Sequence, residues 1–146
     1  ILNDPVVEEM FGYPVLLMHG DLLCTEDIEY QKFRKVSRDI KWQKEFLSKP
    51  LAERRIIAQN LRGASKEATG KKKEEIMDVS ECEVIKIIQE SSVSLLIHGH
   101  THRPNSHSIA LEKHTAKRIV LGDWDEYGWY VWMDSNSCEL NKFSIS

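Results

Sequence analysis

Several features that assign a chain to a familiar class are missing from this sequence of 146 residues. No apolar run approaches the roughly 18 to 20 residues that a membrane-spanning helix needs. The chain opens with neither the basic start nor the apolar core of a signal peptide. Its first residue is Ile rather than Met, and it reads as a sequence entered midway. Repeats and low-complexity tails are also missing, and the length fits one domain with a real core.

Cysteine is scarce, and its placement excludes two kinds of site. Cys24, Cys82 and Cys138 are far apart and odd in number. This argues against a disulfide framework and for a reducing cytoplasm. No Cys-x-x-Cys pair exists, so a cysteine-based zinc site is not expected. We expect each cysteine to be a small buried apolar residue.

The net charge is only −3, but its distribution is uneven. Residues 32–73 hold 14 of the 20 Lys and Arg and only four acidic residues, so this segment carries +10 and the remainder −13. Such asymmetry indicates that the basic segment meets something anionic, such as phosphate, nucleic acid or a membrane surface.

The apolar pattern predicts a mixed α/β fold. Residues 5–19 read as strands on either side of a turn around Gly12, and the second strand is continuously apolar at 15–18. Residues 80–146 return to α/β character after a helical stretch. We expect an amphipathic helix after a capping-box pattern at residues 80–83, a buried strand at 93–97, and further strands at 106–111, 118–121, 128–133 and 138–145.

Residues 26–78 between these parts have helical spacing. Pro50 indicates a break and restart, and Gly63 and Gly70 are expected to interrupt again. One apolar stripe is expected to be helix-packing core; it comprises Phe33, Val36, Ile40 and Leu47.

Two buried strands lead into loops that carry histidine. The strand at 15–18 is followed by His-Gly-Asp at 19–21, and the strand at 93–97 by Gly-His-Thr-His at 99–102. An extended backbone would point the last two imidazoles the same way, and neutral imidazole is the commonest transition-metal ligand. The pattern predicts metal binding by His19, His100 and His102, with His98 structural at its strand end.

A wider set of motifs makes the pattern more specific. Gly-His-Thr-His resembles the final motif of calcineurin-like metallophosphoesterases, and His-Gly-Asp resembles the motif before it. Within that superfamily, the motifs together resemble the UDP-2,3-diacylglucosamine hydrolases over nearly the whole chain. They lie at residues 18–27, 30–34, 65–68, 76–79 and 98–104.

The resemblance implies the C-terminal part of a metallophosphoesterase β-sandwich flanked by helices, with an inserted helical cap. Residues 1–26 and 79–146 would form the core, without its N-terminal half, and 27–78 the cap. An upstream half would complete the core, so exposed apolar surface is expected at residues 15–18.

The resemblance also implies two divalent metal ions, usually manganese, with His19 and His100 on one and His102 on the other. The upstream family motifs that supply the remaining ligands, including the bridging aspartate, do not occur before His19. Gly122 and Asp123 lie far downstream and are not taken as a substitute. We therefore expect the 146-residue chain alone to be inactive, and we identify no catalytic residue beyond the metal ligands.

The activity implied is hydrolysis of the pyrophosphate bond of UDP-2,3-diacylglucosamine to UMP and 2,3-diacylglucosamine 1-phosphate, in lipid A biosynthesis. A protein with this lipid substrate and a basic, partly apolar cap would bind peripherally to the cytoplasmic face of a Gram-negative inner membrane, as a monomer. The positions that match substrate-contacting residues of the family are Asp27, Tyr30, Phe33, Ser65, Thr69, Lys72 and His100.

Two other functions fit parts of the sequence. Another calcineurin-like phosphoesterase would explain the histidine loops but not the long basic helical insertion. A nucleic-acid-binding module would use the +10 segment. Few aromatic residues there are arranged for stacking, and no binding motif is present, so we expect no nucleic-acid partner.

Overall fold

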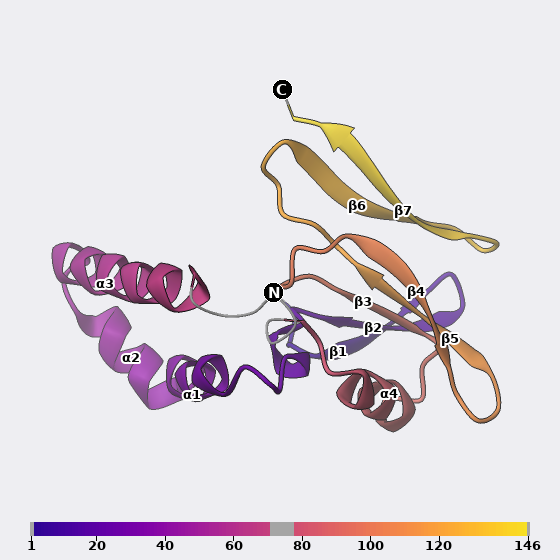
Figure 1. Cartoon of the computed structure of the whole chain (residues 1–146), viewed down its shortest axis with the longest axis horizontal. Coiled ribbons are helices and arrows are strands. Elements are labelled where there is room, and N and C mark those ends of the chain that lie inside the picture. The colour runs from indigo at the N-terminus through magenta and orange to yellow at the C-terminus, as the bar shows by residue number, and fades with distance from the viewer. Residues whose placement is uncertain (1, 71–77, 146) are drawn as a thin grey trace. The chain divides into compact units, whose positions relative to one another are not determined.

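The computed structural model describes residues 2–70 and 78–145, and the backbone alone at 66–70. The chain forms two compact units, one of residues 1–23 and 79–146 and the other of residues 24–78 (Figure 1). The first unit contains both sheets and helix α4 (Glu81–Glu90), and the described part of the second contains three helices. The predicted mixed α/β class is confirmed.

A five-stranded sheet forms the centre of the first unit, in the order β1-β2-β3-β5-β4. The strands β2 (Tyr13–Met18), β3 (Leu95–His98) and β5 (Thr115–Val120) are parallel neighbours. The outer strands are antiparallel to them: β1 (Val6–Met10) pairs with β2, and β4 (Asn105–Ala110) with β5. The parallel centre means that β2, β3 and β5 end at the same edge.

Both faces of this sheet are covered within the chain. Side chains alternate along β2, so Leu16 packs in the cluster that includes Val84 and Ile88 of α4. Val15 faces the other way and packs toward the second sheet. Val15 and Leu16 are therefore almost fully buried, and the exposed apolar surface predicted at residues 15–18 is wrong.

The second sheet is a hairpin of β6 (Tyr127–Met133) and β7 (Cys138–Ser144). Its inner face covers the central sheet with Val131, Met133 and Leu140. On the outer face the ring of Phe143 lies over Gly128, where an added Cβ would be 2.4 Å from the ring. Aromatic rings continue on this face beyond Phe143; Trp124, Tyr130 and Trp132 are all exposed.

Helix α4 opens at the predicted place, but not by the predicted cap. Ser80 is the N-cap residue, yet its hydroxyl makes no capping bond and lies 2.9 Å from Sγ of Cys82. The backbone N–H of Ser80 instead donates to the carbonyl of Leu23 at 2.8 Å. This bond ties the start of α4 to the end of the short 3₁₀ helix Asp21–Leu23, which follows β2.

The second unit consists of α1 (Ile28–Ser37), α2 (Ile40–Ser48) and α3 (Leu51–Gly70). The helical prediction for this segment is confirmed over the described residues, and so is the restart at Pro50. The predicted interruption at Gly63 is wrong, because α3 continues through it; a helical glycine costs only about 1 kcal/mol relative to alanine.

The apolar stripe of this unit is not packing core, which corrects the prediction. Asp39 caps α2 by accepting the backbone N–H groups of Lys41 and Trp42, so the stripe crosses a helix break. All four of its members are exposed: Phe33, Val36, Ile40 and Leu47. No helix among the described residues combines the length and apolar character needed to cross a bilayer.

The cysteines also differ from expectation. Cys24 is buried, as predicted, but Cys82 is exposed and Cys138 is half-buried. Burial raises the pKa of the Cys138 thiol. No disulfide joins any of the three.

Candidate functional site

The three parallel strands bring their following loops to one edge of the sheet. Met18 of β2 pairs with His98 of β3, and His98 pairs with Val120 of β5. The two histidine loops therefore follow neighbouring strands and lie at the same edge of the sheet. A third loop, which contains Asp123, leaves β5 at this edge as well. We call this the histidine edge; it comprises residues 19–21, 98–102 and 121–123.

His19 is held by its backbone on both sides. Its N–H donates to a carboxylate oxygen of Asp4 at 2.9 Å, and its carbonyl accepts the N–H of Gly99 at 3.0 Å. Its imidazole is half-exposed, and Nδ1 lies 3.5 Å from Oδ1 of Asp21, which is fully buried. A carboxylate near Nδ1 is the usual partner of an imidazole that binds a metal through Nε2.

His100 lies beside His19. Their ring centroids are 4.9 Å apart, with an angle of 54° between the ring planes. Two imidazoles at this separation can share one metal ion, because zinc–nitrogen bonds are about 2.0 to 2.1 Å long. The structure thus brings together the two histidines that were predicted to share a metal.

The loop that carries His100 and His102 is not extended, which corrects the prediction. Both residues have positive φ, 68° and 54°. Non-glycine residues in this region carry backbone strain of about 1 to 3 kcal/mol each. Strain of this kind gathers at functional sites, and here it falls on two predicted metal ligands.

His102 has a carboxylate partner of its own. Its Nδ1 lies 3.5 Å from Oδ2 of Asp123, and both side chains are more than half-exposed. The two histidines His19 and His102 therefore share one arrangement, an aspartate oxygen facing Nδ1.

Below the loops, His98 at the end of β3 and Arg118 within β5 are both buried, and their side chains are neighbours. Nδ1 of His98 is 2.9 Å from the carbonyl of Gly99, and Nε2 is 3.5 Å from Nη1 of Arg118. His98 lies at the end of its strand, as predicted.

Apart from His100, the predicted substrate contacts fall within residues 24–78. Asp27 is the N-cap of α1, where its carboxylate accepts the backbone N–H of Tyr30 at 3.0 Å. The rings of Tyr30 and Phe33 are neighbours, with centroids 6.3 Å apart. Ser65 is exposed on α3. The helix includes the backbone of Thr69, and Lys72 lies outside the described residues.

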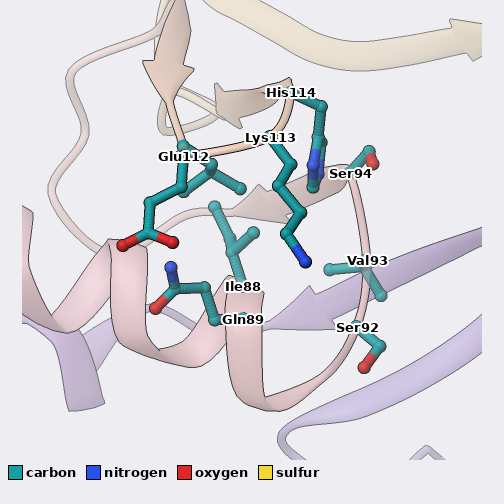
Figure 2. A pocket seen from close by; sticks show the side chains of 9 residues that line it. Ile88, Gln89, Ser92, Val93, Ser94, Glu112, Lys113 and His114 are labelled. Atoms are coloured by element: carbon teal, nitrogen blue, oxygen red, sulfur yellow. The ribbon is translucent and has the colours of Figure 1, made fainter.

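The described pockets of the first unit are at the other end of the sheet. One, of about 520 Å³, lies between the end of α4 and the turn between β4 and β5 (Figure 2). Figure 2 shows Glu112 reaching toward Gln89 of α4, while Lys113 extends across the opening. Another, of about 430 Å³, lies at the start of β2 and β3. Neither contains a residue of the histidine edge.

The similarity to known proteins covers nearly the whole chain, although no protein-family model matches it. The chain is 48% identical over 136 residues to UDP-2,3-diacylglucosamine hydrolase of Marinobacter nauticus, and the aligned residues cover 93% of this chain and 56% of that protein. The protein of the same name from Cellvibrio japonicus is 42% identical over 145 residues, which cover 99% and 60%. That from Pseudomonas fluorescens is 43% identical over 146 residues, which cover 100% and 59%. The chain is a homologue of the UDP-2,3-diacylglucosamine hydrolases. The resemblance inferred from the motifs is confirmed, and the chain spans somewhat over half the length of these hydrolases.

The residues present fit part of the metal site that the hydrolase resemblance implies. His19 and His100 form a close pair, and a carboxylate oxygen of Asp21 lies 3.5 Å from Nδ1 of His19. Within residues 2–70 and 78–145, no group of three or more His, Cys, Asp or Glu side chains is arranged to hold a metal ion. The pair is therefore a partial ligand set.

Sequence reasoning missed Asp123, although a signal for it was present. Asp123 follows a buried strand and a glycine, just as Asp21 does. Only the parallel pairing of β3 with β5 places it at the histidine edge. Distance along the chain was therefore a poor reason to set it aside.

Proposed function

We propose that the protein hydrolyses the pyrophosphate bond of UDP-2,3-diacylglucosamine in lipid A biosynthesis. Water adds to the phosphorus next to uridine, the bond to the bridging oxygen breaks, and the products are UMP and 2,3-diacylglucosamine 1-phosphate. The proposal is supported by homologues of this name at 42–48% identity. The observation that carries it is the close pair of His19 and His100 at the carboxyl edge of parallel strands, where α/β folds place active sites.

We further propose that the fold is of the calcineurin-like metallophosphoesterase type and that the cofactor is a pair of divalent ions, preferably Mn²⁺. His19 and His100 would hold one ion and His102 the other. Such a pair supplies a water activated as hydroxide and neutralises charge on the phosphoryl group.

The chain's own residues orient these ligands. In the proposed site Asp21 accepts the Nδ1 proton of His19 and Asp123 that of His102, so that Nε2 of each ring is the ligating atom. The Asp4 carboxylate and the Gly99 N–H hold the His19 backbone in place. These contacts fix imidazole direction before any ion binds, which limits the entropy lost on binding.

The helical unit is proposed as the cap that holds the lipid part of the substrate. It combines exposed apolar residues with the +10 segment, so its composition suits both acyl and phosphate contacts. Tyr30 and Phe33 would contact acyl groups. The polar contacts would come from Asp27, Ser65, Thr69 and Lys72, together with His100.

The same composition supports a membrane partner. Exposed Phe33, Val36 and Ile40 lie close in sequence to Lys32, Lys35 and other basic residues of α1. Basic residues near an anionic bilayer contribute on the order of 1 kcal/mol each. We propose peripheral binding to the cytoplasmic face of the inner membrane, as a monomer and without a nucleic-acid partner.

The test is release of UMP from UDP-2,3-diacylglucosamine with added Mn²⁺, run on the longest natural protein that contains this chain. His19→Ala and His100→Ala should each abolish most of the activity and reduce bound metal. His114→Ala, at the opposite end of the sheet, is the matched control and should retain both. Lys72→Ala should reduce the activity less than His100→Ala does. No turnover by the unaltered protein, or equal losses in all four variants, would overturn the proposal.

A further inference from the structure

A buried polar pair lies directly beneath the histidine edge. His98, at the end of β3, is only 1% exposed, and Arg118 of β5 is 9% exposed. Most of the surrounding core consists of apolar residues such as Leu96 and Ile119. Burying polar side chains costs free energy unless hydrogen bonds replace the lost water, so the bonds that this pair makes indicate what it does.

The two neighbours of the His98 ring define its tautomer. A carbonyl oxygen can only accept, so Nδ1 must donate its proton to Gly99, at 2.9 Å. A guanidinium can only donate, so Nε2 is the acceptor for Nη1 of Arg118, at 3.5 Å. Arg118 therefore favours the one form of His98 in which Nδ1 faces Gly99 as a donor.

Gly99 connects this pair to both histidine loops. Its carbonyl accepts from His98 and from the N–H of Thr101, at 2.9 Å each. Its own N–H donates to the carbonyl of His19 at 3.0 Å. Gly99 thus contacts the backbone of His19 through its N–H, contacts the His98 ring through its carbonyl, and directly precedes His100.

The loop after β2, at residues 19–21, also packs against the His98 ring. Gly20 has φ +111°, and a Cβ added there would lie 2.7 Å from Nδ1 of His98 and 2.9 Å from the Gly99 oxygen. The loop after β2 can approach this closely only without a side chain at residue 20. A change in the position of the His98 ring would therefore reach both loops.

We propose that His98, held in one tautomer by Arg118, is a positioning residue that sets His19 and His100 against each other through the Gly99 peptide. The inference rests on the proposed function in one respect, because the pair it positions is taken to bind metal. The hydrogen bond between His98 and Gly99 does not depend on any ion. The test of this bond can therefore succeed or fail independently of the test of metal binding.

The matched variants are His98→Asn and His98→Gln. The amide nitrogen of asparagine falls near the place of Nδ1, so Asn keeps the donor to Gly99. In glutamine that nitrogen falls near Nε2, so Gln keeps a polar side chain of similar size but loses this donor. Arg118→Met leaves His98 unchanged and removes the donor to Nε2 at similar volume.

The first measurements use the 146-residue chain without metal. In ¹⁵N NMR spectra the His98 ring should carry its proton on Nδ1, and Arg118→Met should lower the share of this tautomer. Amide hydrogen exchange at Gly99 should be at least about tenfold faster in His98→Gln than in His98→Asn, which should match the unaltered chain. A proton on Nε2, or equal exchange in both His98 variants, would overturn the proposal.

The second measurement is the affinity for Zn²⁺ as a probe ion, by calorimetry. Changing residues that orient metal ligands typically costs about 10- to 100-fold in affinity, so His98→Gln should weaken binding by about tenfold or more and His98→Asn should restore it. Equal affinities would overturn the positioning role. No Zn²⁺ binding by the unaltered chain, together with the expected exchange pattern, would count against the proposed metal site and still support the Gly99 contact.

Discussion

Nδ1 of His102 lies 3.5 Å from a carboxylate oxygen of Asp123, although strands β4 and β5 separate the two residues in sequence. The contact exists because β5 returns the chain to the edge that β3 has just left. A carboxylate in this place raises the basicity of a ligating imidazole and fixes its direction.

We therefore predict that Asp123→Ala lowers metal affinity by about 10- to 100-fold. The measurement is Mn²⁺ binding by the longest natural protein that contains the chain. Asp125→Ala is the control, because Asp125 is exposed two residues away in the same loop. If both variants bind Mn²⁺ as the unaltered protein does, Asp123 does not orient His102.

Gly20→Ala should destabilise the chain more than Gly12→Ala does. Both glycines have positive φ, so alanine is strained at either position, by roughly 1 to 3 kcal/mol. At Gly20 the new Cβ would also clash with His98 and the Gly99 carbonyl, whereas nothing lies within 4 Å at Gly12. Urea unfolding of the two variants measures the difference, and equal midpoints would contradict the close packing of the two histidine loops.

The turn between β6 and β7 should weaken in acid. Hydrogen bonds from the backbone N–H groups of Asn136 and Ser137 hold the pKa of Asp134 below its usual 3.8. Its contribution to stability is therefore fully present above about pH 4 and is lost as the pH falls through the lowered pKa.

The variant that tests this is Asp134→Ala. At pH 6 the variant should melt at a lower temperature than the unaltered chain. This difference in melting temperature should become smaller at pH 2.5. Ser135→Ala, in the same turn, is the control and should change little at either pH. A gap that stays constant with pH would show that ionised Asp134 has no special role.

The helical unit should bind anionic vesicles in preference to neutral ones. Lys35 of α1 is exposed beside apolar residues, and reversing its charge should cost about 2 kcal/mol, which is more than tenfold in partitioning. Flotation of Lys35→Glu with phosphatidylglycerol vesicles is the measurement. Lys86→Glu on α4 is the matched control, and equal flotation in both would contradict an electrostatic role for α1.

The 146-residue chain alone should release no measurable UMP from UDP-2,3-diacylglucosamine, even with added Mn²⁺. The reason is that His19 and His100 are a partial ligand set and no larger group occurs among the described residues. Robust Mn²⁺-dependent turnover would contradict this, and would indicate that Asp21 or Asp123 completes the site.

The elements that could be predicted from sequence are those with strong local patterns. The continuously apolar run that includes Leu16 predicted a buried strand. The His-Gly-Asp and Gly-His-Thr-His motifs predicted metal-binding histidines. The sequence pattern did not predict the break before α2, because the apolar stripe continues at helical spacing on both sides of Asp39. The structure shows that Asp39 caps α2 at this place. The role of Asp123 was missed because sheet order is a long-range property.

The hydrogen bond between Ser80 and Leu23 has a consequence for how this fold can change. It joins the residues that flank the helical unit, so that residues 24–79 form a long loop closed at its base. The entropy of closing such a loop depends weakly on its length, at about 0.6 kcal/mol for each doubling. Helices could therefore be lengthened, shortened or exchanged in this place as a cassette, while the strands that present His19 and His100 stay as they are. One histidine edge could serve a range of lipid shapes in this way.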